Sequence, residues 1–289
     1  MVKFSESFQI APGEYFDVDI VGDTEAYVDP DKLIAASSDL FDGTAAKHSV
    51  GTFMSTVLSS YKVSDTKSVE QLLSVPHEIN ATHLGLSAHE SRGNGTSFPM
   101  LDQYLRRALA QSTQGSVLRE NPKVLVVLVN RFDKDHFSDL ITNLILPQLC
   151  DFTLGVCQSY GIHAVTSFPI DYFDPASKCW LKKNVLLPFD SKHEPVILIP
   201  KKMLVKNYDF SISDYVWKFL LEIRQSEIKD STGKFISKKQ LFADEVRPYG
   251  QNASKQYALN DLQKNVVHLE EYLAIKKRNS TSQASSNSL

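Results

Sequence analysis

KVLVVLVNRFDKDHFSDLITNLI, residues 123–145, carries the strongest structural signal in this chain. It opens on an unbroken apolar run, Val124–Val129, which is rich in valine and far too short to cross a membrane. Such a run is typical of a strand buried on both faces of a sheet. Polar residues follow at once, and an amphipathic helix is predicted from about Phe137 to Tyr160. Because ligands of open α/β sheets lie where a buried strand ends and the next helix begins, this junction is a candidate site.

Three carboxylates stand at this junction. Asp135 and Asp139 are four residues apart, so they share one face of the predicted helix, and Asp133 lies in the loop before it. A Mg²⁺ or Mn²⁺ ion held by these oxygens can activate water or hold a phosphate during hydrolysis. The alternative is structural, with Asp135 as a helix N-cap and Asp139 as a first-turn carboxylate favoured by the helix dipole.

A second group of carboxylates lies in EYFDVDIVGDTEAYVDPDKL, residues 14–33. Apolar and acidic residues alternate there as in a half-buried strand, and Gly22-Asp23 marks a turn. The predicted β-hairpin brings Asp19 and Asp29 close together as further metal ligands. Charges on the wet face of an edge hairpin explain the same pattern without a ligand.

A glycine-rich loop, residues 92–97, leads into a predicted helix, Phe98–Ala110. The backbone N–H groups at Gly93 and Gly95 and at the helix start form an anion site, and Arg92 adds guanidinium donors for a phosphate. The loop is neither a Walker loop nor a GxGxxG motif, and a simple turn is the alternative.

Histidines and cysteines form no standard metal motif. Three histidines recur at spacings of six, which is not the spacing of a zinc-binding helix, so whether they bind a metal is left open: His77, His83 and His89. Three cysteines are interpreted as reduced core thiols: Cys150, Cys157 and Cys179.

Strands are predicted after Gly161. His163–Phe168 is one, ended by Pro169 and a turn, and Trp180–Pro188 forms a hairpin with Pro195–Pro200. Lys201 follows the last predicted strand. This position resembles that of the lysine that orients the attacking water in restriction-type nucleases. Those enzymes have an acidic residue two positions before the lysine, where this sequence has Ile199. A solvated lysine is the alternative.

Other regions are predicted to be helical. Residues 48–63 and 67–74 have the spacing of helices packed on a core, and the chain after Tyr208 is helical, with one helix from Ser237 to Val246. Apolar residues between 257 and 277 recur every three and four positions, which suits either docking on a core or binding a partner protein.

The predicted fold class is mixed α/β (α+β), a central mixed sheet with flanking helices and a helical C-terminal region. The domain boundaries are a core over residues 1–207, a helical region over 208–278, and a disordered tail over 279–289. The net charge of −3 gives no overall basic excess for nucleic-acid binding, and no apolar run is long enough for a membrane helix. The expected compartment is the cytoplasm.

Four segments carry a resemblance: FDVDI to VDP within residues 16–30, HLGLS from His83 with the two glycines of the loop, DKDHFSDLITNLI at 133–145, and VILIPKKML at 196–204. Their layout resembles a group of uncharacterised bacterial proteins found near antiviral defence genes. The resemblance implies a role in bacterial antiviral defence and transfers no catalytic residue.

Two hypotheses from different classes follow. In the first, the protein is a metal-dependent phosphodiesterase or nuclease of a defence system. Its metal ligands would be Asp133, Asp135 and Asp139 with Asp19 and Asp29, its phosphate site Arg92, Gly93 and Gly95, and its auxiliary cation Lys201. In the second, it is a non-catalytic sensor or assembly subunit that binds a partner protein through residues 257–277. Nucleic acid or a nucleotide is a further candidate partner, a nucleotide through the glycine loop alone.

Overall fold

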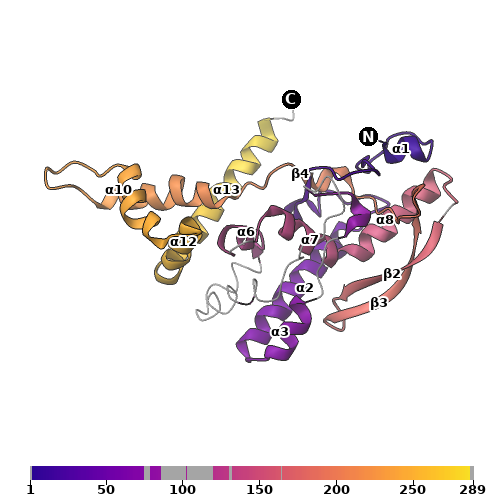
Figure 1. Cartoon of the computed structure of the whole chain (residues 1–289), viewed down its shortest axis with the longest axis horizontal. Coiled ribbons are helices and arrows are strands. Elements are labelled where there is room, and N and C mark those ends of the chain that lie inside the picture. Colours follow the sequence, from indigo (N-terminus) through magenta and orange to yellow (C-terminus); the bar gives the residue numbers. More distant parts are fainter. Residues whose placement is uncertain are drawn as a thin grey trace. The chain divides into compact units, whose positions relative to one another are not determined.

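The computed structural model describes residues 2–74, 79–85, 102, 120–129, 132–163 and 165–286 (Figure 1). The mixed α/β class is confirmed, with helices, small antiparallel sheets and a helical C-terminal region. Contacts divide the chain into two compact units: unit 1 is residues 1–101 with 134–207, and unit 2 is residues 102–133 with 208–289. The last break falls after Asn207, where the sequence predicts a boundary, but residues 102–133 belong with the C-terminal helices.

Unit 1 contains two of the helices that the sequence predicts. α2 (Gly43–Lys62) begins after Asp42, whose carboxylate accepts a hydrogen bond from the Ala45 N–H, and α3 (Thr66–Leu73) begins in the same way after Asp65. The apolar stripe of α2, including Phe53, is buried. The unit also contains shorter helical turns: α1 (Phe4–Ser7), η1 (Pro30–Lys32), η2 (Asn80–Thr82) and η3 (Lys201–Met203).

The single helix predicted from Phe137 to Tyr160 is two helices. α7 (Lys134–Leu144) and α8 (Leu146–Ser159) are bent by 73° at Ile145. Pro147 lies in the first turn of α8, and because proline has no N–H it cannot continue the hydrogen-bond ladder of α7. Within the described residues no single helix is long and apolar enough to cross a membrane; the bent α7–α8 pair reaches that length and composition only together.

The central strand predicted at Val124–Val129 is wrong, because these residues form a helix, α6 (Val124–Leu128). Their burial is as expected, with Val124, Leu125 and Leu128 almost fully enclosed. A short apolar run predicts burial equally well for a strand and for a helix, so the pattern alone does not fix the backbone type. α6 belongs to unit 2, where it packs against α9 (Ile212–Asp214) and α12 (Ala253–Lys264).

The main sheet of the described part of unit 1 is a long hairpin. β2 (Val165–Asp174) pairs antiparallel with β3 (Cys179–Pro188) over ten residues each, and β3 lies against α8 (Figure 1). β2 continues through Pro169 and Asp171, where the sequence predicts a strand end and a turn. Each strand of a two-stranded hairpin has a free edge, so a proline without an N–H is tolerated there.

The hairpin predicted within residues 14–33 does not form. β1 (Tyr27–Val28) pairs instead with β4 (Leu204–Val205), and Asp19 forms an isolated bridge with Lys3. The predicted pairing of Trp180–Pro188 with Pro195–Pro200 is also wrong, since β3 pairs with β2 and only the isolated bridge between Phe189 and Pro195 joins these regions.

Residues 196–199 are buried without belonging to a helix or strand. Their N–H groups find scattered acceptors: Ile197 N–H donates to the Ala81 carbonyl at 2.7 Å, and Leu198 N–H donates to Thr153 Oγ1 on α8 at 2.9 Å. On α7, Ser138 Oγ accepts from the Val28 N–H at 3.0 Å. The hydroxyl groups of Thr153 and Ser138 therefore satisfy the N–H groups of Leu198 and Val28, which in a wider sheet would bond to the backbone of a neighbouring strand.

Unit 2 is helical throughout its described elements. After α6 and α9 come η4 (Tyr215–Leu220), α10 (Leu221–Glu227), α11 (Lys238–Leu241), η5 (Phe242–Val246), η6 (Arg247–Tyr249), α12 and α13 (Val266–Ser286). The helix predicted at Ser237–Val246 is confirmed as α11 and η5. Both η4 and η5 are π-helices, and Trp217 of η4 stacks on Phe242 of η5 with ring centroids 4.6 Å apart.

The apolar repeat at residues 257–277 is distributed over α12 and α13, which are separated at Asn265. Four of its leucines are buried inside the protein: Leu259, Leu262, Leu269 and Leu273. This geometry corresponds to docking on a core, so these leucines present no apolar seam to a partner. α13 extends to Ser286, whereas the sequence predicts disorder from Asn279.

The cysteines divide into two classes. Burial raises the pKa of Cys150 to about 12 and that of Cys157 to about 11, whereas Cys179 on β3 is exposed, so the prediction of a core thiol is wrong for Cys179. Since the thiolate is the reactive form, we expect an aromatic disulfide reagent at about pH 8 to label one thiol in the native protein and three after denaturation. A Cys179→Ser variant should show no native labelling; a second native equivalent would contradict this assignment.

Candidate functional site

The predicted N-terminal metal ligands bond to backbone. Asp19 Oδ1 accepts from the N–H groups of Val2 at 3.0 Å and Val21 at 3.1 Å. Burial acts to raise the pKa of Asp19, but these hydrogen bonds outweigh it and the pKa is lowered. Asp29 is buried and caps η1, accepting from the Asp31 N–H at 3.1 Å. Both carboxylates therefore stabilise the local backbone by accepting hydrogen bonds from its N–H groups.

The carboxylates at the predicted junction are divided between the units. Asp135 and Asp139 lie in the first two turns of α7 in unit 1, and Asp133 belongs to unit 2. A Cβ added at Gly85 would stand 3.6 Å from Asp135 Oδ1, so Gly85 lies close to the start of α7. Over the described ranges, no three His, Cys, Asp or Glu side chains gather as a metal ion requires. The Mg²⁺ or Mn²⁺ site stays a prediction.

The remaining predicted residues have separate settings. Lys201 Nζ donates to the Gly13 carbonyl oxygen at 2.8 Å, which ties η3 to the N-terminal segment. His83 has a left-handed backbone (φ 51°), and burial lowers the pKa of its imidazole although the charge of Asp23 opposes this. Five predicted site residues lie outside the described part of the chain. They are the phosphate-site residues Arg92, Gly93 and Gly95 and the histidines His77 and His89.

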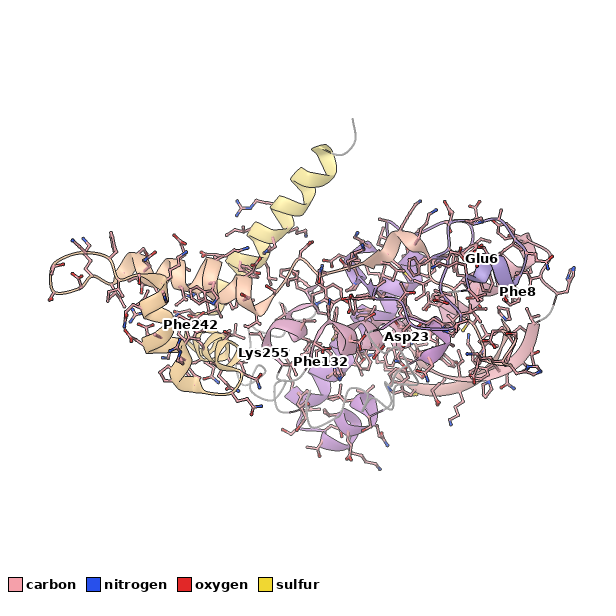
Figure 2. The ribbon with its side chains drawn as sticks, turned by 45° about the horizontal axis from the view of Figure 1, so that its top comes forward. Glu6, Phe8, Asp23, Phe132, Phe242 and Lys255 are labelled. Carbon is pink, nitrogen blue, oxygen red and sulfur yellow. The ribbon has the colours of Figure 1, made fainter. Side chains whose placement is uncertain are left out.

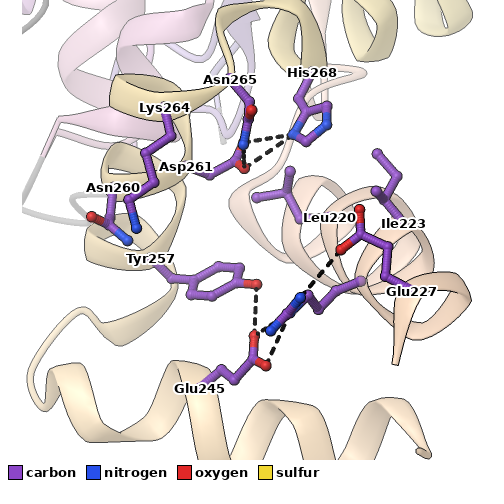
Figure 3. Close-up of a pocket in the computed structure, with 11 residues that line it drawn as sticks. Leu220, Ile223, Glu227, Glu245, Tyr257, Asn260, Asp261, Lys264, Asn265 and His268 are labelled. Carbon is purple, nitrogen blue, oxygen red and sulfur yellow. Dashed lines mark hydrogen bonds and ion pairs between the residues drawn. The ribbon is translucent and has the colours of Figure 1, made fainter. Parts of the chain in front are cut away.

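Unit 2 contains a pocket of about 330 Å³ that was not predicted from the sequence (Figure 3). Its walls come from η4, α10, η5, α12 and the start of α13. On α12 the lining residues recur at spacings of three and four, as on one helix face: Tyr257, Asn260, Asp261 and Lys264. The other lining residues are Leu220, Ile223, Arg224, Glu227, Glu245, Asn265 and His268.

One side of the pocket is organised by Arg224. Its Nε donates to both carboxylate oxygens of Glu245 at 3.0 Å, and its Nη1 donates to Glu227 at 3.2 Å. The Tyr257 hydroxyl donates to Glu245 Oε2 at 3.4 Å (Figure 3). The hydrogen bond to Glu245 raises the pKa of Arg224, and burial with the charge of Glu245 raises the pKa of Tyr257 to about 12. Arg224 therefore stays charged and Tyr257 stays neutral around neutral pH.

The other side is organised by Asp261. His268 Nδ1 lies 3.0 and 3.1 Å from its two carboxylate oxygens, and the Asn265 amide donates to Oδ1 at 3.3 Å (Figure 3). The imidazole and the ring of Phe219 form a T-shaped pair. A proton on Nδ1 is favoured by the carboxylate, and the neutral ring then has Nε2 as an acceptor. The pocket is thus lined by two preformed hydrogen-bond networks.

Comparison with known proteins assigns the family. A family model described as a domain of unknown function, DUF8370, matches residues 8–211, more than half of the chain. The chain belongs to the DUF8370 family. No curated protein and no solved structure matches it. All of the pocket residues lie after residue 211, so the DUF8370 match covers the predicted junction and glycine loop but not the pocket.

Within unit 2, a partly buried lysine of α12 bonds to the end of the DUF8370 segment that contains α6. Lys255 Nζ donates to the carbonyl oxygens of Phe132, at 3.0 Å, and Val129, just beyond the end of α6 (Figure 2). Burial lowers the pKa of Lys255 to about 8, against the opposing charge of Asp133. α12 therefore contacts Val129 and Phe132 through Lys255 and lines the pocket through Tyr257 to Lys264.

Lys255 predicts a pH dependence of stability. Because its pKa is about 8 in the folded protein and roughly 10.4 in an unfolded chain, the unfolded state binds more protons between these values. Relative to Lys255→Met, the wild type is expected to gain stability as pH rises from about 8 to about 10.4, with a slope below about 1.4 kcal/mol per pH unit. Urea unfolding across this range measures it. Lys264→Met, at the exposed end of the same helix, should leave the slope unchanged; equal slopes for wild type and Lys255→Met would refute the assignment.

Proposed function

We propose that the protein is a non-catalytic sensor that binds a small polar ligand in the pocket of unit 2. The observation that carries the proposal is the pocket of about 330 Å³ with its two ordered networks, one around Arg224 and one around Asp261. Ligand pockets generally span roughly 300–1,000 Å³ and combine apolar walls with a few fixed polar groups. Leu220 and Ile223 supply the apolar part.

The state of the carboxylates favours binding over catalysis. Glu245 already accepts from Arg224 and Tyr257, and Asp261 already faces His268 and Asn265. In unit 1, Asp19 and Asp29 bond to backbone N–H groups. Fixed, partnered charges suit recognition of a ligand's own charge pattern, because they need no reorganisation on binding.

The two π-helices give further support. Leu220 ends η4 and Glu245 lies within η5, so both irregular turns contribute to the pocket wall. A π turn is rare, and π turns are frequent at functional sites. The resemblance to proteins found near antiviral defence genes supports a role for such a sensor in bacterial defence.

The test is a melting scan of the full chain with separate panels of amino acids, amines, carboxylic acids, sugar phosphates and nucleotides. A ligand at about 100 times its Kd stabilises the folded state by about 2.7 kcal/mol. The shift should vanish in Asn260→Phe, which fills the pocket from α12, and persist in Asn184→Phe, the same substitution at an exposed position of β3 in unit 1. A shift that survives Asn260→Phe, or no shift from any panel, would overturn the proposal.

A further inference from the structure

The charges on the α10 side of the pocket are not balanced. On the α10 side, Glu227 and Glu245 share one guanidinium, that of Arg224, so this side has an excess of one carboxylate. Glu227 accepts from Arg224 through Oε2, and its Oε1 accepts no hydrogen bond from any residue that the structure describes. A carboxylate with open lone pairs favours a ligand group that has only donors, and an ammonium has three.

The α12 side carries one carboxylate, Asp261, which already faces His268 and Asn265, and one cation. Lys264 lines the pocket and makes no ion pair with any described residue, and Asn260 lies one turn before it on the same face. Figure 3 shows Lys264 and Asn260 on α12, with Glu227 across the pocket from them. A lysine ammonium and a side-chain amide are donors for a carboxylate.

Between the two ends the wall is apolar or aromatic. Leu220 and Ile223 line it, and the ring of Tyr257 lies next to the Glu245 carboxylate that its hydroxyl contacts. A short aliphatic chain fits such a wall, and an aromatic face attracts a cationic group near it.

We infer that the ligand class is a small aliphatic zwitterion, an amino acid whose ammonium faces Glu227 and Glu245 and whose carboxylate faces Lys264 and Asn260. This inference rests on the proposed function and adds the chemistry of the ligand. A simple amine would leave Lys264 without a counter-charge, and a simple carboxylate would meet the acidic excess at the α10 side. Both single-charge ligands are therefore weaker binders than the zwitterion.

Titration calorimetry of the full chain with butylammonium, butanoate, 4-aminobutanoate and the common α-amino acids tests the inference. At least one zwitterion should bind ten times or more tightly than both single-charge analogues. Glu227→Gln and Lys264→Gln remove a charge at an exposed position and change the side-chain shape little. Each variant should lower the affinity for that zwitterion tenfold or more. Lys264→Gln should also bring butylammonium close to the zwitterion in affinity.

The outcomes separate the two proposals. If no amino acid binds, or if a single-charge analogue binds as tightly as its zwitterion, the ligand class is wrong. If a nucleotide or sugar phosphate then stabilises the wild type but not Asn260→Phe, the sensor function stands with a different ligand. If nothing in any panel binds, both proposals fail. Circular dichroism and melting of each variant without ligand identify any loss of binding that comes from misfolding.

Discussion

Residues 1–207, expressed without residues 208–289, are expected to aggregate. The cause is α6, whose apolar side chains are covered by α9 and α12, both of which this truncation removes. Five side chains at or after α6 are at most 2% exposed in the full chain: Val124, Leu125, Leu128, Val129 and Phe132. Full burial of one such side chain contributes about 1.5–3 kcal/mol, so uncovering several is comparable with the whole stability of a typical domain, about 5–15 kcal/mol.

The same result is expected for residues 8–211, the region that the DUF8370 model matches. Analytical ultracentrifugation and urea unfolding of both fragments, with the full chain as reference, measure the effect. A matched fragment with Leu125→Gln and Leu128→Gln should be more soluble than the unmodified fragment, because it lacks part of the exposed apolar surface. Monomeric fragments that unfold cooperatively would contradict the division of the chain into these two units.

Thr153→Val is expected to destabilise unit 1 by about 1–3 kcal/mol, the cost of leaving a buried donor without a partner. Thr153 is fully buried, and its Oγ1 accepts from the Leu198 N–H at 2.9 Å while donating to the Leu149 carbonyl at 2.7 Å. Valine keeps the shape but removes the acceptor. Ser138→Ala should act in the same way on the Val28 N–H.

The matched control is Thr166→Val, the same substitution at an exposed position of β2. Melting temperatures should fall by roughly 2–4 °C for each kcal/mol lost in a domain of this size. If Thr153→Val and Thr166→Val melt alike, the hydroxyl does not hold residues 196–199 against α8.

The sequence predicts burial and helical faces well, because these depend on local spacing. The stripe of α2 with Phe53 and the helix start at Ser237 belong to single segments, and the structure contains both. The run at Val124–Val129 predicts only that it is buried; its helical form depends on α9 and α12, about 85 and 130 residues later in the chain. Pro169 suggests a strand end, yet β2 passes through it. Among the described residues this strand pairs with β3 alone, and a proline is tolerated in such an edge strand.

The candidate site was harder to predict because it depends on contacts between segments that are far apart in the sequence. Asp19 and Asp29 have the residue types of metal ligands, but backbone N–H groups from neighbouring turns occupy them. The α12 face of the pocket has a readable spacing, Tyr257 to Lys264. Its counterparts, Arg224 and Glu245, come from two other helices, so only the tertiary fold brings the charges together.

The chain contains two tryptophans, and each unit has one. Trp180 on β3 donates its indole N–H to the Leu72 carbonyl at 2.9 Å and packs edge-on against Phe53, whereas Trp217 of η4 stacks on Phe242. A Trp217→Phe protein therefore emits indole fluorescence from unit 1 alone, and a Trp180→Phe protein from unit 2 alone. The unfolding of each half can be recorded separately in the intact chain, without an added dye. The Trp217 signal originates from the π-helix that ends at the pocket wall, so it is also an optical reporter of ligand binding there.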